Sequence, residues 1–253
     1  AAGAVDVAVE TGDEALLEAV VRQWEATVAR RTYLTGGMGA HHEGESFGED
    51  FVLPPDRAYS ETCAGAASVM LSWRLLLATG DPRYADLIER TLYNVVATSP
   101  AADGRAFFYA NTLHQRSPGQ PMPGDMVSPR PVSSLRAPWF AVSCCPNNVA
   151  RLLASLSAYV ATADGKGLQI HQYADAEIEA ELDGGDRVGL RMRTAYPDDG
   201  TVTVEVTRAP AAPVSISLRI PPWATGATVA EPGAAPRPAL SPVTEVTRVF
   251  SAG

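Results

Sequence analysis

Cys144-Cys145-Pro146-Asn147-Asn148 places two of the three cysteines of this chain side by side. Adjacent cysteines rarely form a disulfide with each other, because the short ring strains the geometry of the bond, so both thiols are better placed to face a common partner. Pro146 suits the first turn of a helix. The apolar residues after it follow helical spacing: Val149, Leu152, Leu153, Leu156, Tyr159 and Val160. The pattern predicts that both thiols lie at a helix N-terminus, where the helix dipole favours thiolate over thiol.

The third cysteine has a carboxylate close to it, in the segment Glu61-Thr62-Cys63. Side chains at i and i+2 share one face of an extended segment, and we expect Glu61 and Cys63 to act together in this way. Three sulfurs and one carboxylate provide four anionic donors, the number that tetrahedral zinc takes. Two alternatives stay open, because three cysteines can also be small buried apolar residues, and because zinc sites with four protein ligands are usually structural.

The composition predicts a protein with a substantial core and an acidic surface. The chain has 253 residues, of which 46% are hydrophobic, enough for one large or two moderate domains. The net charge of −9 argues against a broad nucleic-acid surface, and no apolar run looks long enough to span a bilayer. An odd, clustered set of cysteines favours a metal site over a disulfide framework and does not fix the compartment. We expect a cytoplasmic protein.

The two ends of the sequence predict an internal piece of a longer protein. Residues 1–10 already have a helical pattern, and the strand pattern of 245–250 continues almost to the last residue. No signal-peptide pattern stands at the start.

Helical patterns recur in pairs through the first part of the chain. Gly12 and Gly80 lie in two Thr-Gly-Asp turns, each of which separates one helical pattern from the next. The expected helices span residues 1–10, 13–31, 64–78 and 82–96. Recurring helix pairs are typical of an α/α toroid or a solenoid. Two long loops, 33–60 and 98–143, interrupt the helices, and loops of this length are usually functional.

The pattern changes to period two in the last third of the chain. Apolar residues alternate with polar ones in the segments 188–192, 202–206 and 214–220. This alternation is typical of the antiparallel strands of a β-sandwich. The sequence therefore predicts an α+β multidomain protein with a helical domain, 1–163, and a β-domain, 164–253.

Four motifs of this sequence, in their order and spacing, resemble glycoside hydrolase family 127, a family of β-L-arabinofuranosidases. The motifs are Tyr33-Leu34-Thr35-Gly36-Gly37-Met38-Gly39, Gly44-Glu45-Ser46-Phe47, Tyr59-Ser60-Glu61-Thr62-Cys63 and Ser143-Cys144-Cys145-Pro146-Asn147. The resemblance covers nearly the whole chain. It implies the C-terminal half of an (α/α)6 barrel, followed by part of an antiparallel β-sandwich, with the first half of the barrel missing.

The resemblance also implies a retaining glycoside hydrolase that releases terminal β-L-arabinofuranose. Matched motif by motif, the ligands of Zn²⁺ would be Glu61, Cys63, Cys144 and Cys145. Cys144 would also be the nucleophile and form a thioglycosyl intermediate. Glu45 would be the general acid/base, and Tyr109 would contact the sugar. The partner would be an arabinose-containing oligosaccharide or glycan, with no nucleic acid and no membrane, and a homodimer of the full-length protein stays open.

Without the resemblance, the same residues have plainer explanations. Glu45 has other acids near it in its loop and would be a solvated glutamate, while Tyr109 and its two phenylalanine neighbours would be core. His41 and His42 could be metal ligands, although such a pair is more often a loop surface. Two rival functions follow: a related glycosidase with another sugar specificity, and a non-catalytic, zinc-stabilised carbohydrate-binding or structural protein. Half a toroid would expose faces that other helices should cover, so we expect the piece alone to be poorly folded and inactive.

Overall fold

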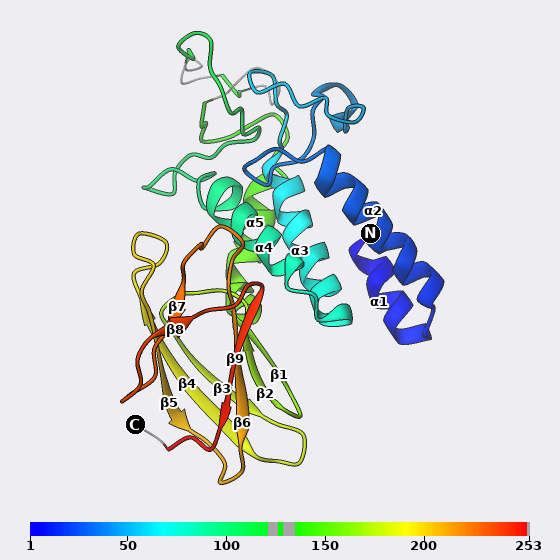
Figure 1. Ribbon diagram of the computed structural model, residues 1–253. Coiled ribbons are helices and arrows are strands. Elements are labelled where there is room, and N and C mark those ends of the chain that lie inside the picture. Colours follow the sequence, from blue (N-terminus) through cyan, green and yellow to red (C-terminus); the bar gives the residue numbers. More distant parts are fainter. Residues whose placement is uncertain (121–125, 129–134, 252–253) are drawn as a thin grey trace. The chain divides into compact units, whose positions relative to one another are not determined.

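The computed structural model describes residues 1–120, 126–128 and 135–251, and the chain forms two compact units, Ala1–Ala154 and Ser155–Gly253 (Figure 1). The first unit is helical with long loops, and the second consists mostly of β-strands. The chain is therefore a mixed helix-and-sheet, α+β protein, as its sequence predicts. The position of the boundary between the two domains stays a prediction.

The helices of the first unit occur in the predicted order. They are α1 (Ala2–Thr11), α2 (Glu14–Arg30), α3 (Thr62–Thr79), α4 (Arg83–Thr91) and α5 (Cys145–Ala154), with the 3-10 turn η1 (Glu43–Glu45) and the π-helical turn η2 (Leu92–Val96). α4 continues directly into η2, and together they occupy the segment for which a single helix is expected.

Glycine and aspartate residues end and begin these helices as the two Thr-Gly-Asp turns predict. Gly12, at φ 69°, follows α1 and donates its N–H to the carbonyls of Ala8 and Val9. Asp13 then caps α2, because its carboxylate accepts the N–H of Leu16 at 3.0 Å. Gly80, at φ 71°, ends α3 in the same left-handed conformation, which glycine adopts without steric cost.

α3 is the central helix of this unit. It contacts α1, α4 and α5, and its buried residues include Val69, Leu75 and Leu76. By length and composition α3 could cross a membrane, so the expectation that no apolar run is long enough is wrong by that criterion. A helix that packs against neighbours on several sides is apolar around most of its circumference and meets the same criterion. The contacts of α3 with three other helices are those of a core helix.

The described parts of the two long loops lie at the end of the helical unit where α3 begins (Figure 1). Backbone hydrogen bonds join them: the N–H of Asn111 donates to the carbonyl of Ser60 at 3.1 Å, and the N–H of Thr62 donates to the carbonyl of Tyr109 at 3.0 Å. The side chain of Asn111 adds a second bond to the Ser60 carbonyl at 2.8 Å. Glu61 lies between these bonds, so the loops together fix the backbone at the start of α3.

The second unit contains the short helix η3 and three small sheets. Its elements are η3 (Leu156–Tyr159), β1 (Ala161–Asp164), β2 (Gly167–Ile170), β3 (Ala176–Glu181), β4 (Arg187–Thr194), β5 (Val202–Arg208), β6 (Val214–Arg219), β7 (Thr228–Val229), β8 (Arg237–Pro238) and β9 (Val243–Arg248). The strand orders are β1-β2-β6-β9, β3-β4-β5 and β7-β8.

The two larger sheets share one apolar core, to which the predicted alternating residues contribute. The core residues of β2, β4 and β6 are Leu168, Ile170, Val188, Leu190, Met192, Val214 and Ile216. One detail of the sandwich prediction is wrong, because β2 and β6 pair in parallel rather than antiparallel. Parallel neighbours need a crossover connection, and here β3, β4 and β5 form another sheet between β2 and β6 in the chain.

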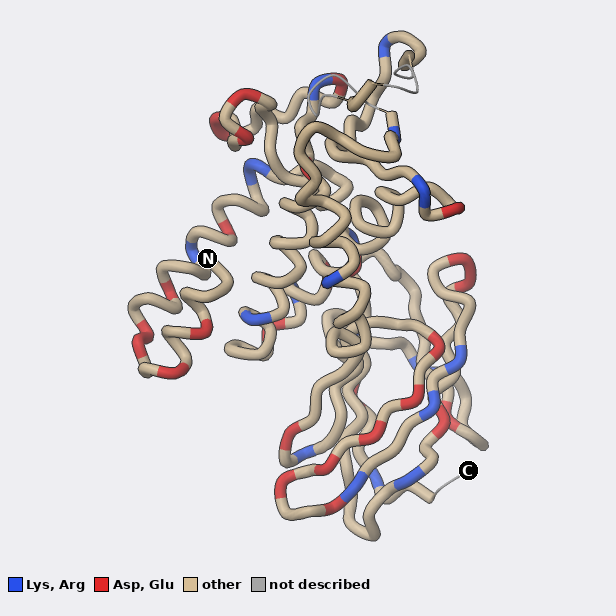
Figure 2. The backbone as a smooth tube through the Cα atoms, turned by 180° about the vertical axis from the view of Figure 1, so that it is seen from behind, with Lys and Arg blue, Asp and Glu red and all other residues tan. Residues whose placement is uncertain are grey.

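Charges of opposite sign lie side by side on the sheet β3-β4-β5 (Figure 2). Arg191 of β4 lies 3.1 Å from Glu177 of β3 and 3.1 Å from Glu205 of β5. Arg187 and Glu181 form a similar exposed pair at 3.4 Å. Exposed pairs of this kind stabilise a protein by at most about 1 kcal/mol each. This side of the sheet is therefore a solvated surface, while the alternate residues of the same strands supply the core.

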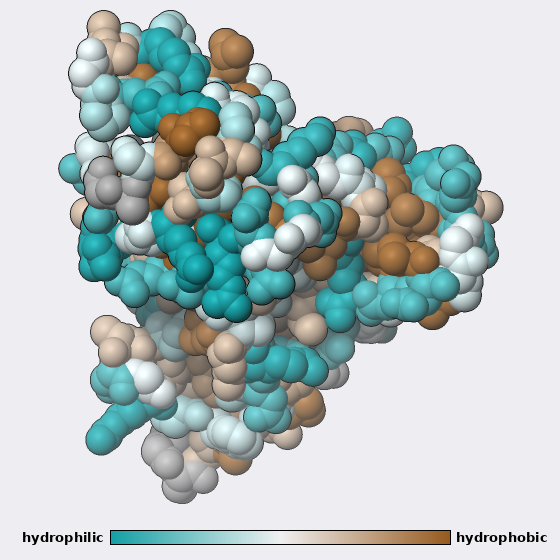
Figure 3. Space-filling view, turned by 90° about the horizontal axis from the view of Figure 1, so that it is seen from below, coloured by the Kyte–Doolittle hydropathy of each residue, from teal (hydrophilic) through white to brown (hydrophobic). Residues whose placement is uncertain are grey.

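Apolar side chains gather in patches on the surface seen in Figure 3. On the helices, Val7 and Val9 of α1 and Leu77 of α3 are more than half exposed. A pocket of about 570 Å³ opens among α1, α2 and α3, and its lining includes Trp24, Val28, Met38, Met70 and Leu71. The helical unit thus presents apolar surface that its described helices leave uncovered.

Candidate metal centre

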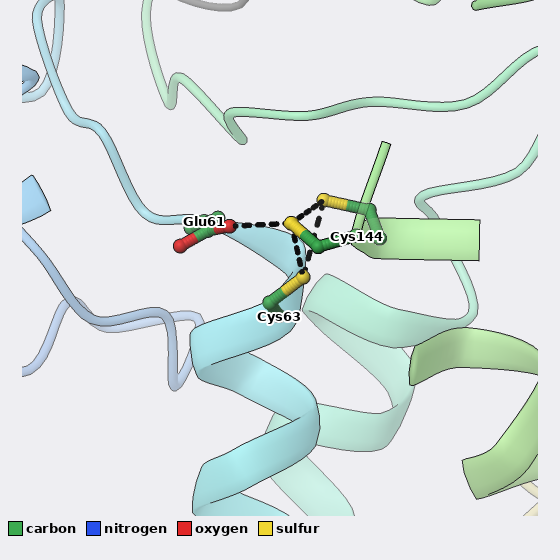
Figure 4. A group of neighbouring side chains, drawn as sticks. Glu61, Cys63 and Cys144 are labelled. Atoms are coloured by element: carbon green, nitrogen blue, oxygen red, sulfur yellow. Dashed lines mark hydrogen bonds between the residues drawn. The ribbon is translucent and has the colours of Figure 1, made fainter. Parts of the chain in front are cut away.

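Glu61, Cys63, Cys144 and Cys145 lie together where α3 and α5 begin (Figure 4). Glu61 immediately precedes α3, and Cys63 is in its first turn. Cys145 is the first residue of α5, and Cys144 precedes it. α3 and α5 contact each other, so two helix N-termini bring these four side chains together from distant parts of the chain. In the part of the chain that the structure describes, these side chains form the cluster able to hold a metal ion.

Glu61 and Cys63 do not share one face of an extended segment, so that expectation from their spacing is wrong. Glu61 has extended backbone (φ −63°, ψ 137°), but α3 already begins at Thr62. Loop contacts hold the helix end there, because the side-chain hydroxyl of Thr62 donates to the carbonyl of Phe108 at 2.8 Å. These contacts are distant in sequence, which is why apolar periodicity places the helix start two residues later, at Ala64.

The donor atoms have the spacing of a tetrahedral metal site. Sγ of Cys63 lies 3.1 Å from Sγ of Cys144 and 3.4 Å from Sγ of Cys145, and the last two sulfurs are 4.0 Å apart. Oε1 of Glu61 lies 3.3 Å from Sγ of Cys144. Zinc–sulfur bonds of about 2.3 Å give sulfur–sulfur edges of about 3.8 Å in a tetrahedron. All three cysteines are free thiols, and small shifts of their sulfur atoms would complete such a site.

The surroundings of the sulfur atoms disfavour thiolates unless a cation neutralises them. Hydrogen bonding to Cys145 and burial raise the pKa of the Cys63 thiol far above its usual range. Burial raises the pKa of the Cys144 thiol to about 11. A buried group of anionic donors is costly without a compensating charge, whereas a coordinating metal ion deprotonates a thiol outright. The donor set therefore fits a metal ion, and its sulfur content fits zinc among the common metals.

Tyr109 lies directly against Cys144. Its Oη is 3.2 Å from Sγ of Cys144, and its ring packs edge-on against Phe140 with the ring centroids 5.5 Å apart. The side chain is almost fully buried in an aromatic cluster that includes Tyr59. The ring of Tyr109 is thus part of a core, as the plainer explanation predicts, while its hydroxyl group reaches the sulfur of the predicted nucleophile.

Glu45 is connected to the same aromatic cluster through Tyr59. Oη of Tyr59 donates to Oε1 of Glu45 at 3.0 Å, and the rings of Tyr59 and Tyr109 lie 6.2 Å apart. Burial, followed by the nearby charge of Glu61, raises the pKa of Tyr59 far above its usual range, so its phenol stays a hydrogen-bond donor. Glu45 is exposed, as a solvated loop glutamate would be. Unlike a freely solvated residue, it has a buried partner.

The backbone of Glu45 is unusual as well. Its φ of 49° lies in the left-handed region, which residues with a side chain rarely adopt. Backbone strain of this kind costs about 1–3 kcal/mol and is concentrated at functional sites. Ser60, beside the metal cluster in the chain, has a similarly positive φ of 35°.

His41 and His42 do not belong to the metal cluster. His42 packs edge-on against Tyr59, with the ring centroids 5.0 Å apart, and burial lowers the pKa of His42 below its usual value. His41 is exposed. The pair is therefore loop structure, which is the plainer of the two explanations that the sequence allows.

Two polar residues of this site, Tyr59 and Asn148, lie in the motifs quoted above, but the sequence assigns no role to either of them. Nδ2 of Asn148 donates to Sγ of Cys63 at 3.1 Å. Asn148 follows Cys144 by one helical turn, so the expected helix could have indicated that both face the same side. Tyr59 and Glu45 meet through the folding of a loop, and no spacing rule predicts that contact.

The fold and the cluster together define a two-domain α+β chain with a thiol-rich cluster that is able to hold a metal ion. Residues 1–158 match the model of the GH127 catalytic domain of β-L-arabinofuranosidase, and residues 167–251 match the model of the GH127 middle domain. Both matches have the domain order found here. The chain belongs to glycoside hydrolase family 127, whose members are glycoside hydrolases.

Individual relatives agree with this assignment. A non-reducing end β-L-arabinofuranosidase from Bifidobacterium longum subsp. longum is 35% identical over 218 residues, which cover 85% of this chain and 32% of the relative. A GH127 β-L-arabinofuranosidase from Geobacillus stearothermophilus T6 is 36% identical, with a TM-score of 0.86 over 100% of this chain and 39% of its own. A further GH127 β-arabinofuranosidase of known structure is 31% identical, with a TM-score of 0.83 over 100% of this chain and 40% of its own. The chain spans about a third of the length of the curated relative.

Proposed function

We propose that this protein is a retaining glycoside hydrolase that releases terminal β-L-arabinofuranose from a glycan. The surroundings of Cys144 carry the proposal: its sulfur contacts Tyr109, Glu61 and Cys63 at 3.1–3.3 Å. Glu45 is tied by a hydrogen bond to Tyr59, which packs with Tyr109. The thiol of Cys144 would be the nucleophile. The carboxyl group of Glu45, bonded to the same aromatic cluster, would be the proton donor. The names of the relatives support the choice of sugar.

In the first step, the thiolate of Cys144 attacks the anomeric carbon of the arabinofuranoside and a carbon–sulfur bond forms. The bond between that carbon and the leaving-group oxygen breaks, and Glu45 gives its proton to this oxygen. In the second step, water attacks the same carbon, gives a proton to Glu45, and the carbon–sulfur bond breaks. Two inversions at one carbon retain its configuration, the outcome that carboxylate pairs achieve in other retaining enzymes.

We assign Glu61, Cys63, Cys144 and Cys145 as the residues that would hold zinc. When bound, zinc supplies the positive charge that keeps these thiols deprotonated at neutral pH. The protein supplies the rest: α3 fixes Glu61 and Cys63, α5 fixes the two adjacent cysteines, and Tyr109 orients the sulfur of Cys144.

Metal content and hydrolysis of an aryl β-L-arabinofuranoside, measured together on the full-length protein, test this proposal. We expect about one zinc per chain in the wild type and loss of zinc in Cys63→Ser. Glu45→Gln should keep its zinc and lose about 100- to 10,000-fold in kcat, the usual contribution of a general acid/base. Zinc-free wild-type protein would contradict the metal assignment. Attachment of a trapped sugar analogue to a carboxylate rather than to Cys144 would contradict the nucleophile.

Two rival functions have different outcomes in the same experiments. A related glycosidase with another sugar specificity would bind zinc but prefer a different member of a panel of aryl glycosides. A zinc-stabilised carbohydrate-binding or structural protein would lose stability on removal of zinc and show no turnover with any of them. The carboxyl group of Glu45 is connected to the metal cluster through Tyr59 and Tyr109. This connection favours an enzyme, because a structural zinc site does not need it.

We also propose the finer architecture that this function implies. The helical unit would be half of an (α/α)6 barrel, and the second unit would be part of a β-sandwich. The apolar pocket among α1, α2 and α3, of about 570 Å³, supports the first part, since further barrel helices would cover it. The core shared by the sheets β1-β2-β6-β9 and β3-β4-β5 supports the second.

A further inference from the structure

The three sulfur atoms of the cluster have different neighbours. Sγ of Cys63 accepts a hydrogen bond from Nδ2 of Asn148 at 3.1 Å. Sγ of Cys144 instead lies 3.2 Å from Oη of Tyr109 and 3.3 Å from Oε1 of Glu61. The amide of Asn148 is a donor that comes from outside the cluster and is directed at Cys63.

Arg151 determines which end of the Asn148 amide faces the sulfur. Its Nη2 donates to Oδ1 of Asn148. A guanidinium group has donors only, so the oxygen of the amide must face Arg151. Nδ2 is thereby directed toward Cys63 and toward the carbonyl of Cys144, which it approaches at 3.3 Å. The donor-only chemistry of the guanidinium group therefore fixes the orientation of the amide.

We propose that Asn148, oriented by Arg151, is a positioning residue that holds Cys63 as the permanent ligand of the metal centre. This inference rests on the proposed function. A nucleophile that takes up a glycosyl group must loosen from the metal ion, while the other ligands stay in place. An N–H donor stabilises the thiolate of Cys63 and fixes its side chain. The sulfur of Cys144 instead faces the hydroxyl group of Tyr109 at 3.2 Å, so the amide of Asn148 is a donor specific to Cys63.

The first turn of α5 places Asn148 and Cys144 on the same side of the helix. Asn148 follows Cys144 by four residues, and its backbone N–H also donates to the carbonyl of Cys144. The same helical turn therefore carries the predicted nucleophile and the donor to Cys63 on α3. Partners that orient metal ligands in this way typically contribute 10- to 100-fold to metal affinity.

Metal affinity of Asn148→Leu, measured by chelator competition with zinc, tests this inference, and Asn147→Leu is the matched control. Asn147 is the preceding residue of the same first turn but is exposed. We expect zinc binding to weaken about 10- to 100-fold in Asn148→Leu and to stay unchanged in Asn147→Leu. Wild-type zinc affinity in Asn148→Leu would overturn the inference. A wild-type protein that binds no zinc would overturn the metal centre itself, so the two failures are distinguishable.

A second readout separates a hydrogen bond from a merely structural role. In the cobalt-substituted protein, a donor to a thiolate lowers the electron density on sulfur, so its removal should move the thiolate-to-cobalt absorption to lower energy. Arg151→Leu should move it in the same direction, and Arg151→Lys, which keeps a donor, should stay near the wild type. Arg151 is exposed, so these variants should fold even if Asn148→Leu does not. An unchanged spectrum in Arg151→Leu would overturn the orienting role.

Discussion

Two buried tyrosines connect the carboxyl group of Glu45 with the sulfur of Cys144. Tyr59 donates to Glu45, Tyr109 contacts Cys144, and their rings lie 6.2 Å apart. Both side chains are at most 2% exposed, so neither can move without disturbing the packing around it. In the proposed mechanism, these rigid partners would hold the two reacting groups in position, which is a large part of what an active site contributes to catalysis.

Tyr59→Phe should therefore weaken catalysis without preventing folding. The ring is kept, and only the hydroxyl group that donates to Glu45 is lost. Glu45 becomes a carboxylate as it gives up its proton, and a hydrogen bond to a charged group contributes about 1.5–3 kcal/mol, so we expect kcat/KM for an aryl arabinofuranoside to fall about 10- to 100-fold. Tyr33→Phe is the control, because it also removes a buried hydroxyl, one that donates to the carbonyl of Pro54. Equal losses in both variants would contradict a specific role for Tyr59.

At the scale of elements, α3 packs tightly against the end of the α4–η2 segment. Gly65 of α3 faces Val95 of η2. A Cβ atom on Gly65 would lie 2.8 Å from Cγ1 of Val95 and 3.4 Å from Cγ2 of Thr91. Val95 is fully buried, so its side chain has little room to give way.

Gly65→Ala should destabilise the protein, although alanine is normally the better helix former. The helical preference for alanine is worth about 0.5–1 kcal/mol, and overpacking a core costs about 1–3 kcal/mol. We expect a net loss of about 1–2 kcal/mol in the free energy of unfolding, measured by urea denaturation. Gly3→Ala is the matched control, since α1 leaves open space around Gly3 and the substitution should be neutral or stabilising. In the double variant Gly65→Ala/Val95→Ala, the strain should be relieved, and additive losses would contradict the proposed clash.

The ends of helices and the pairing of strands show which features local sequence patterns can predict. Gly12 and Gly80 end helices through contacts within a few residues, as the two Thr-Gly-Asp turns predict, and Asp13 caps α2 in an equally local way. The start of α3 depends on Thr62 and its distant partner Phe108. The pattern of apolar residues therefore predicts a helix start two residues after the true one. The parallel pairing of β2 with β6 depends on the path of a whole segment, so alternation alone cannot predict it.

At the scale of the whole molecule, the metal cluster joins residues that are far apart in the chain. Cys63 and Cys144 are separated by 81 positions, and their sulfur atoms lie 3.1 Å apart. The chain has only three cysteines, so the sequence alone indicates that these three side chains could share one site. The hydrogen bonds that Tyr59 and Asn148 make use common polar residues, whose partners are determined by the packing of loops and helices. The sequence could therefore indicate the residues of the cluster but not the residues that hold them in position.

The second unit contains a buried histidine whose protonation should affect stability. His171 is 9% exposed; its Nε2 lies 2.8 Å from Oγ1 of Thr162, and its carbonyl accepts a bond from Nε of Arg219 at 2.6 Å. Burial, together with the charge of Arg219, lowers the pKa of His171 from 6.5 to about 4. Between these two pH values the unfolded chain binds a proton at this position and the folded protein does not. The contribution of neutral His171 to the free energy of unfolding is therefore fully present above about pH 6.5. It is lost as the pH drops toward 4.

The contribution of His171 to this pH dependence can be isolated by substitution. A pKa difference of this size corresponds to about 3 kcal/mol at most, since each pKa unit is worth about 1.4 kcal/mol. Many carboxyl groups also titrate in this range, so the comparison must be between variants. In His171→Gln, the loss of unfolding free energy between pH 7 and pH 4.5 should be smaller than in the wild type by about 1–3 kcal/mol. His114→Gln, at an exposed loop position, should lose as much stability on acidification as the wild type. Urea titrations at both pH values measure these differences, and an equal acid sensitivity of His171→Gln and wild type would mean that His171 is protonated in the folded protein.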